Sequence, residues 1–461
     1  MSHPLIRYAD EHLVVAAKPP GLAARAAAAG EQDGLADLLR RDPRAQLVNS
    51  TLRVVWAPDP ADSGLCVMAR TDAAVADLLR AESGGRVGHK MTEASLEHVA
   101  RPSGFALPRR WRHAAGLDLH HPRSGDRFGI VEPPPESFSA ALAGETDGAR
   151  LAVLRARERR RGLFDPALTD AYRLMNGASD GVDDHVVDAL AGALLIGHRG
   201  PLSRPLVDAL AALERPRAIY ARQLRRDVRQ TKSGDATPVL VHGEPLPERF
   251  PIKEGGLTYL ASMREGYSFG LFLDQRETRA WLRAAIKPGS EVLNVFAYTC
   301  AFSLCAAAAG ARATSLDLSR RYLDWGRANF EASGHAAGAH DWIFGDAFDW
   351  LKRLARKGRR FGTVILDPPT FSTAKTSGAF SAEQDYGRLA GLALALVAPG
   401  GRLVASTNAA RLAPARFAAD LDLACRTAGR SPGSVRLATQ PVDFPASPGE
   451  PAYLKIWSAV V

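Results

Sequence analysis

Val364-Ile365-Leu366-Asp367-Pro368-Pro369-Thr370-Phe371 is an apolar run that stops at an acid, two prolines and an aromatic residue. The apolar part is typical of a buried parallel strand. Two consecutive prolines cannot continue a sheet, because each lacks an N–H group and fixes φ. The stretch therefore predicts a strand that ends in a rigid turn. In open α/β sheets, ligands bind at that edge. The turn is either a stiff loop or a place where Asp367 and Phe371 hold a planar base.

The bulk properties of the chain bound its class. Its 461 residues are too many for one ordinary domain, so we expect two to three. Hydrophobic residues make up 46%, and no apolar run reaches the roughly 18 residues of a membrane-spanning helix. The first residues lack a secretory signal pattern. The cysteines show no pairing or metal-ligand spacing, which fits reduced thiols in a cytoplasmic protein with no metal site; they are Cys66, Cys300, Cys305 and Cys425.

The charge balance favours a polyanionic partner. The net charge is +9, and most of the positive charge is arginine, whose planar fork binds phosphate bidentately. An arginine-rich composition that reflects coding bias is the open alternative. The densest run, at 155–161, falls on a segment with helical character, where it forms either an anion-binding face or a solvated one.

Strands and helices alternate in the last two fifths of the chain. Strands are expected at 292–296, 313–318, 342–344, 364–366 and 403–406, and helices at 302–309, 322–333, 347–357 and 386–397. Such alternation predicts a parallel sheet with a Rossmann-like doubly wound core.

Three further stations lie at the ends of these strands. Small residues after Asn294 let a ligand approach backbone N–H groups at a helix N-terminus, although the G-x-G-x-x-G pattern is absent. Asp317 ends the second strand, where an acid can bind ribose hydroxyls. Asp346 ends the third strand and can accept from an adenine amino group or cap the next helix. Together with Asp367, these stations predict an S-adenosylmethionine site.

The same region resembles the catalytic domain of the RlmI/RlmK-type large-subunit rRNA methyltransferases. The resemblance rests on Phe272-Leu273-Asp274-Gln275-Arg276, Leu293-Asn294-Val295-Phe296-Ala297-Tyr298-Thr299, Leu316-Asp317-Leu318-Ser319 and Leu366-Asp367-Pro368-Pro369-Thr370-Phe371-Ser372. It implies a cofactor site for S-adenosylmethionine made by Gln275, Asn294, Phe296, Tyr298, Thr299, Asp317, Asp346 and Asp367. It implies a catalytic stretch of Asp367, Pro368, Pro369 and Phe371, and an RNA substrate. Cys300-Ala301 stands where that family has Gly-Gly.

The residues after the fifth strand bear on the methylated atom. Methylation of cytosine carbon 5 needs a thiolate nucleophile, and the segment 405–411 has no cysteine. A ring nitrogen such as guanine N7 already presents a lone pair. Asp367 at a base edge and Phe371 stacked on an extruded base fit that reaction. Lys375 and Asn408 resemble the guanine-N7 branch, and Arg276, Arg388 and Arg411 are candidate phosphate contacts.

Three pieces near the start of the chain resemble RluA-type pseudouridine synthases. They are 10–22, Trp56-Ala57-Pro58-Asp59-Pro60-Ala61-Asp62-Ser63-Gly64-Leu65, and a hairpin expected at 117–128. Asp59 falls on the catalytic aspartate of that family. Trp56, Ala57 and Pro60 replace expected polar residues, and the strand that supplies a basic partner has no counterpart. We therefore expect an inactive RNA-docking platform.

The whole chain is thus predicted to be α/β, with a methyltransferase core preceded by a small α+β domain and a degenerate pseudouridine-synthase-like α+β domain. The expected domains are 1–142, 143–260 and 261–461. In the middle domain, which resembles that of the RlmI/RlmK-type enzymes, Asp180, Asp183, Asp184 and His185 are expected in a solvated loop. The predicted function is methylation of a base nitrogen in large-subunit rRNA. Two alternatives stay open: a bifunctional methyltransferase and pseudouridine synthase, and a non-catalytic RNA-binding assembly factor.

Overall fold

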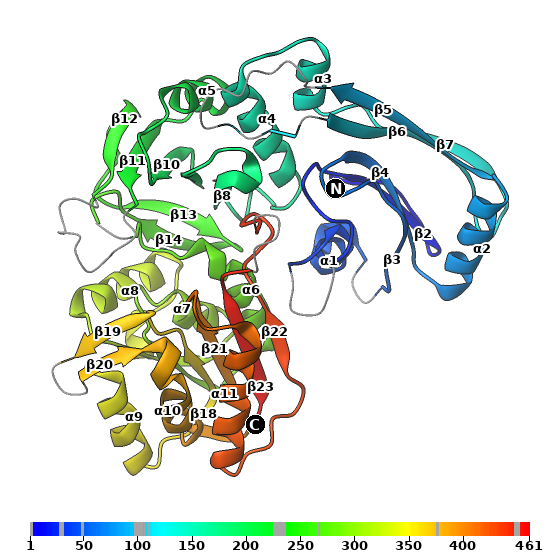
Figure 1. Ribbon diagram of the computed structural model, residues 1–461. Helices are drawn as coiled ribbons and strands as arrows, with labels where there is room; N and C mark the ends of the chain where they lie inside the picture. The colour runs from blue at the N-terminus through cyan, green and yellow to red at the C-terminus, as the bar shows by residue number, and fades with distance from the viewer. Residues whose placement is uncertain are drawn as a thin grey trace.

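A computed structural model describes residues 3–26, 32–47, 50–95, 105, 107–108, 110–224, 237–265, 268–374, 378–446 and 452–461. Three groups of elements follow one another along an arc (Figure 1). We call them the first unit (residues 6–131), the second unit (136–261) and the third unit (273–460). The predicted boundaries at 142/143 and 260/261 stay predictions.

The first unit is built on a seven-stranded sheet. Its core order is β1-β2-β4-β6-β5, with β3 paired to β4 and β7 paired to β6. The strands are β1 (Ile6–Ala9), β2 (Leu13–Lys18), β3 (Arg53–Trp56), β4 (Ser63–Ala69), β5 (Val87–Ser95), β6 (Arg110–His120) and β7 (Arg127–Val131), and the helices are α1 (Leu35–Arg41), η1 (Pro43–Ala45) and α2 (Asp72–Ser83). Strands β2 and β4 are buried throughout. The expected hairpin is the β6–β7 pair.

The second unit combines a five-stranded sheet of order β12-β11-β10-β9-β8 with helices on one side. Its elements are α3 (Glu136–Leu142), α4 (Gly148–Arg160), β8 (Ala171–Asn176), η2 (Gly177–Asp180), β9 (His185–Leu190), β10 (Ala193–His198), α5 (Arg204–Glu214), β11 (Ala218–Gln223) and β12 (Val239–Gly243), followed by the hairpin β13 (Phe250–Glu254) and β14 (Leu257–Ala261).

The solvated loop predicted in the second unit is wrong for two of its residues. Asp180 is only 7% exposed and accepts from both terminal guanidinium nitrogens of Arg160, at 2.7 Å each. His185 is also buried. The arginine run is only partly a solvated face, since Arg160 is buried and Arg155 lies 4.8 Å over the ring of Trp111, whereas Arg161 is exposed. The long side chains of Arg155 and Arg160 join elements.

The third unit contains a seven-stranded sheet of order β17-β16-β15-β18-β21-β23-β22. Its elements are η5 (Leu273–Gln275), α6 (Arg276–Ala285), β15 (Glu291–Val295), α7 (Ala301–Ala308), β16 (Arg312–Asp317), α8 (Arg320–Ala332), η6 (Ala337–Ala339), β17 (Asp341–Phe344), α9 (Ala347–Arg356), β18 (Phe361–Leu366), β19 (Phe371–Ala374), β20 (Gly378–Ser381), α10 (Ala382–Leu394), β21 (Val397–Thr407), α11 (Pro414–Thr427), β22 (Arg436–Ala438) and β23 (Lys455–Val460). Strands β17, β16, β15, β18 and β21 of this sheet run parallel to one another, as the alternation of strands and helices predicts. Strands β23 and β22 add an antiparallel edge.

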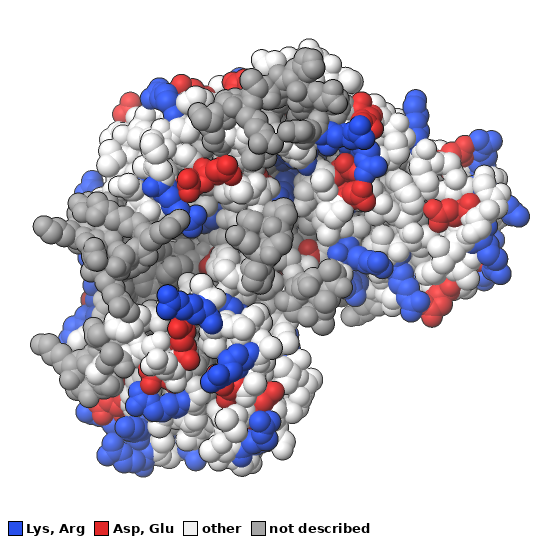
Figure 2. Space-filling model, viewed as in Figure 1, with Lys and Arg blue, Asp and Glu red and all other residues white. Residues whose placement is uncertain are grey.

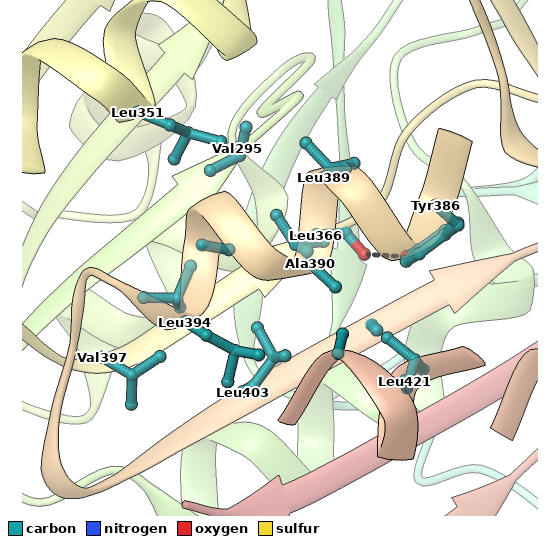
Figure 3. Close-up of a cluster of buried hydrophobic side chains, with 14 of the residues drawn as sticks. Val295, Leu351, Leu366, Tyr386, Leu389, Ala390, Leu394, Val397, Leu403 and Leu421 are labelled. Atoms are coloured by element: carbon teal, nitrogen blue, oxygen red, sulfur yellow. Dashed lines mark hydrogen bonds between the residues drawn. The ribbon is translucent and has the colours of Figure 1, made fainter. Parts of the chain in front are cut away.

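The core of the third unit fixes the end of β18. Figure 3 shows α10 lying across the sheet, with Leu389, Ala390 and Leu394 packed among buried aliphatic residues. The hydroxyl of Tyr386 donates to the carbonyl oxygens of Leu366 (3.1 Å) and Ser406 (2.8 Å). Two neighbouring strands are therefore tied together where both of them end.

The segment 440–446, between β22 and β23, joins all three units. The amide of Gln32 in the first unit donates to the carbonyl oxygens of Pro441 (3.0 Å) and Phe444 (2.7 Å). The fully buried Asp443 pairs with Arg276 of the third unit and accepts from the Arg173 N–H of the second unit at 3.0 Å. We call residues 440–446 the junction segment.

Positive charge is distributed unevenly among the units. Residues 1–142 contain 17 Lys and Arg against 17 Asp and Glu, whereas residues 261–461 contain 24 against 17. The net excess of basic residues therefore belongs mainly to the third unit. Within the described ranges, no helix combines the length and apolar character needed to cross a membrane.

Candidate functional site

A cavity of about 600 Å³ opens at the carboxyl ends of the parallel strands of the third unit. Strands β15, β16, β17 and β18 each lead into one part of its wall. Of the predicted site residues, Gln275, Phe296, Tyr298, Thr299, Asp317, Asp346, Asp367, Pro368 and Pro369 line it. Residues up to 94 positions apart are brought together in this way because parallel strands present their carboxyl ends at one edge.

The turn between β15 and α7 has an unusual backbone. Phe296, Tyr298 and Cys300 have φ values of 61°, 48° and 63°. This left-handed region costs a side-chain-bearing residue about 1–2 kcal/mol. The alternation turns the Ala297 N–H toward the carbonyl oxygen of Leu316, at 3.0 Å. Backbone strain of this kind is stored at functional sites, where the surrounding structure holds it.

Asp317 is fixed by backbone donors on two sides. Its Oδ2 accepts from the Tyr298 N–H and its Oδ1 from the Ser319 N–H, both at 2.8 Å. Burial raises the pKa of this carboxyl, while these hydrogen bonds favour its charged form. The result is a rigid pair of acceptor oxygens on the cavity wall, of the kind that binds ribose hydroxyls.

Asp367 is held by side chains from two different elements. Its Oδ1 accepts from the Ser406 hydroxyl at 2.6 Å and from the Gln275 amide at 3.2 Å. Burial raises its pKa to about 6, and the neighbouring Asp274 carboxylate adds to the rise. Gln275 is 3% exposed, and its Oε1 has no hydrogen-bond partner among the described residues. That oxygen is therefore available to a donor on a ligand in the cavity.

Asp346 has the predicted role of a helix cap, whereas its contact with an adenine amino group stays a prediction. It is the N-cap of α9, where its Oδ1 accepts from the Asp349 N–H at 3.0 Å, and it lines the cavity. Phe348, two residues further on, and Leu318, which follows Asp317, also line the cavity. Acids with apolar neighbours suit an adenosine group, because the base needs flat contacts and the ribose needs acceptors.

Two predicted residues lie outside the cavity wall. Asn294 is 1% exposed and donates to the Ser303 hydroxyl at 3.0 Å, so it holds α7 onto β15 from beneath. Phe371 begins β19, in the hairpin with β20, and is 40% exposed. Arg276 was predicted to be a candidate contact for RNA phosphates. That prediction is wrong, because Arg276 is buried and pairs with Asp443. Lys375 lies outside the described residues.

Sequence reasoning missed several aromatic residues of the wall. Phe380 of β20 is 3% exposed and packs near Phe296 and Phe348, with ring centroids at 6.2 and 5.9 Å. Phe272 is 49% exposed and lies 5.2 Å from the Tyr298 ring. Phe272 was present in a quoted motif, whereas no motif surrounds Phe380.

The residues present fit S-adenosylmethionine. The volume lies within the range of about 300–1,000 Å³ that small-molecule sites have, and the wall supplies acids, a free amide oxygen and apolar surface. The sequence model of the S-adenosylmethionine-dependent methyltransferase family matches residues 181–453, which is more than half of the chain. The chain belongs to the S-adenosylmethionine-dependent methyltransferase family.

Relatives of this methyltransferase extend over most of its length. It is 34% identical over 310 residues to a ribosomal RNA large subunit methyltransferase of Deinococcus radiodurans, covering 64% of this chain and 75% of that protein. It is 31% identical over 307 residues to ribosomal RNA large subunit methyltransferase I of Aeromonas salmonicida, covering 65% and 77%. The crystal structure of SMU.776 in complex with SAH, the demethylated cofactor, aligns with a TM-score of 0.61 and 25% identity, over 75% of this chain and 88% of that one.

The predicted cofactor is thus confirmed, and so is the Rossmann-like methyltransferase core with additional β-rich parts before it. The resemblance of the first unit to RluA-type pseudouridine synthases stays a prediction.

Proposed function

We propose that this methyltransferase transfers a methyl group to a base nitrogen, of the guanine N7 kind, in large-subunit rRNA. The relatives in Deinococcus and Aeromonas are named for large-subunit rRNA, and the chain spans about three quarters of each. A basic third unit suits an RNA substrate. Four buried thiols suit the reducing cytoplasm, where ribosomes are made.

The observation that carries the choice of nitrogen is the composition of the cavity wall. Among the described residues that line it, none is a cysteine, so a covalent thiolate route to carbon has no nucleophile there. Cys300 lies next to the wall, but it is fully buried, its thiol donates to the Tyr298 carbonyl oxygen at 3.4 Å, and burial raises its pKa. A thiol with a raised pKa is a poor nucleophile.

For this reaction the protein mainly has to position the base nitrogen near the methyl group and to stabilise the positive charge that develops on the base. S-adenosylmethionine supplies a methyl group bonded to a positively charged sulfur. The nitrogen lone pair forms the new N–C bond, and the electrons of the breaking C–S bond stay on sulfur. Positive charge then develops on the base. The Asp367 carboxylate, with a pKa of about 6, is ionised at neutral pH and stabilises that charge.

Two loops that would hold the base are tied to each other. The Thr370 hydroxyl, just after the two prolines, donates to the Asn408 amide oxygen at 2.8 Å. Both residues line the cavity and are exposed. The base site is thereby framed by the turn after β18 and the turn after β21, and Phe380 also lines the cavity.

The test is direct. Purified protein, an unmodified transcript of large-subunit rRNA and cofactor carrying a labelled methyl group are incubated, and the nucleosides are identified by mass spectrometry. We expect 7-methylguanosine or another N-methylated base, and the same nucleoside should be absent from rRNA of a deletion strain. Label on carbon 5 of cytosine would refute the choice of nitrogen, and no label in rRNA would refute the substrate.

A second candidate function concerns the first unit. Sequence reasoning expected no basic partner for Asp59, yet the Arg112 guanidinium of β6 pairs with Asp59 and also lies 2.8 Å from Asp62. Lys18 lies beneath, 2% exposed, with burial lowering its pKa to about 7. An exposed carboxylate beside cations is what a uridine isomerase needs. Tritium release from [5-³H]uridine-labelled rRNA that is lost in Asp59→Ala would establish this activity.

A further inference from the structure

The described part of the third unit carries one extended basic surface, and it begins at the cavity. α9 buries an apolar stripe, including Leu351 and Leu354, against the core. Its opposite face is exposed and basic. We call the following residues the α9 track: Arg388, Lys352, Arg353, Arg356, Lys357 and Arg360. Figure 2 shows Lys and Arg side chains gathered over α9, at the lower left of the molecule.

The α9 track is anchored at the cavity by Arg388. This residue of α10 lies with its guanidinium 4.4 Å over the ring of Phe348, which is in the first turn of α9 and lines the cavity. Its side chain is 56% exposed. The ten residues of α9 then carry the track about 15 Å away from the cavity. That length spans on the order of four phosphates of one stacked strand.

Most of this charge is not neutralised within the protein. Asp349 pairs with Arg353 at 2.7 Å, and Asp385 lies 3.4 Å from Arg388. Within the described ranges, Lys352, Arg356 and Lys357 have no acidic partner within ion-pair distance, and all three are exposed. In the first unit exposed arginines such as Arg53, Arg80 and Arg127 are paired with acids, whereas the exposed cations Arg86, Lys90 and Arg123 have no acidic partner among the described residues.

The helix itself does not account for the arrangement. Cations in the last turn stabilise a helix by about 0.3–1 kcal/mol, but the effect fades within that turn, which leaves Lys352, Arg360 and Arg388 without a role. The spacing also places like charges four residues apart, as Lys352 and Arg356 are. Each such pair costs about 0.2–0.5 kcal/mol. A row of phosphates would relieve this repulsion.

We propose that the α9 track binds the phosphate backbone of the RNA whose base enters the cavity. The inference rests on the proposed function, since it takes the substrate to be RNA. It places substrate docking on the third unit, not on the first unit, whose Lys and Arg only equal its Asp and Glu in number.

The experiment compares two triple variants of the full chain that lose the same charge. The test variant is K352Q/R356Q/K357Q, in which glutamine keeps the helix propensity of the residues it replaces. The control variant is R86Q/K90Q/R123Q, at exposed positions of the first unit. Binding of an unmodified large-subunit rRNA transcript is measured by filter retention between 50 and 200 mM KCl. Cofactor affinity and unfolding midpoint of both variants should equal those of the wild type.

Salt dependence gives a quantitative outcome. Each lost phosphate contact lowers the slope of log affinity against log salt by about 0.7–0.9. The slope of the test variant should therefore be smaller by about 2 to 3. Between 50 and 200 mM KCl the affinity of the wild type should then fall by a factor about 20 to 40 times larger than the affinity of the test variant does. The control variant should keep the wild-type slope.

Three results would overturn the proposal: an unchanged slope in the test variant, a loss of slope confined to the control variant, or equal losses in both. Methyl transfer by the wild type is scored in parallel on the same transcript. A wild type that binds but does not methylate would count against the proposed function alone, because the binding comparison does not depend on it.

Discussion

Replacing Gly326 by alanine should loosen the cofactor turn from the far side of a helix. Gly326 lies in α8, and a Cβ there would stand 2.5 Å from the Cys300 Sγ, 2.8 Å from the Cys300 Cβ and 3.1 Å from the ring of Trp342. Cys300 is fully buried and N-caps α7. The clash cannot be relieved without moving the turn, so we expect Gly326→Ala to destabilise the protein by about 2–3 kcal/mol and to weaken cofactor binding about tenfold.

A second substitution should undo most of this damage. Cys300→Gly removes both close atoms and places glycine at φ 63°, which relieves about 1–2 kcal/mol of backbone strain. The lost burial of the thiol side chain, about 0.8 kcal/mol per methylene-sized group, offsets much of that gain. Alone, Cys300→Gly should therefore change stability by less than about 1 kcal/mol. Combined with Gly326→Ala it should restore stability and affinity, giving a coupling energy of about 2 kcal/mol.

Urea unfolding and calorimetric titration with S-adenosylmethionine measure both quantities. The matched control is Gly387→Ala in α10, where a Cβ meets nothing within 4 Å; it should be neutral or stabilise by about 0.5–1 kcal/mol. If Gly326→Ala and Cys300→Gly combine additively, within about 0.5 kcal/mol, the two residues do not act through this contact and the reasoning is refuted.

Four shorter predictions concern single residues. Asp317→Asn should raise the cofactor dissociation constant about 10- to 100-fold, because hydrogen bonds to a charged acceptor contribute about 1.5–3 kcal/mol; unaltered affinity in calorimetry would exclude its role. The pKa of Asp367 is raised to about 6, so its carboxylate is lost as pH falls, and single-turnover methylation should drop about tenfold from pH 7 to pH 5, with a flat profile in Asp367→Asn. Phe371→Ala should impair RNA methylation and spare cofactor binding; intact methylation would remove its stacking role. Asp180→Ala should cost about 3–5 kcal/mol in urea unfolding, because it leaves Arg160 buried without its partner; a loss below 1 kcal/mol would contradict the burial argument.

The sequence sufficed for the core of the third unit and for most of the cavity wall. Buried parallel strands are continuous apolar runs, so β15, β16 and β18 could be located within one to three residues. Once the sheet is parallel, topology alone brings Asp317, Asp346 and Asp367 to one edge. That is a property of connectivity, and it needs no knowledge of side-chain packing.

The errors share a different physical origin. Arg276 was expected at the surface because nothing nearby in the chain reveals Asp443, which lies 167 positions away. Asp180 has the local sequence of a solvated turn. It is buried because the tertiary fold packs the end of α4, with Arg160, against that turn. Asn294 stands among cofactor residues in the motif but points under the turn, because side chains alternate along a strand. Partners distant in sequence decide burial, and local pattern does not record them.

The junction segment has a consequence for the order of events during synthesis. Gln32 and Phe444 are hydrogen-bonded but 412 positions apart. At about 5–20 residues per second, the second partner is made roughly 20 to 80 s after the first. Throughout that interval the first and second units emerge and fold without the segment that fastens them to the third. The arc therefore closes last, as a docking step between preformed units, and its three-way contact should be the final part of the molecule to gain protection from hydrogen exchange.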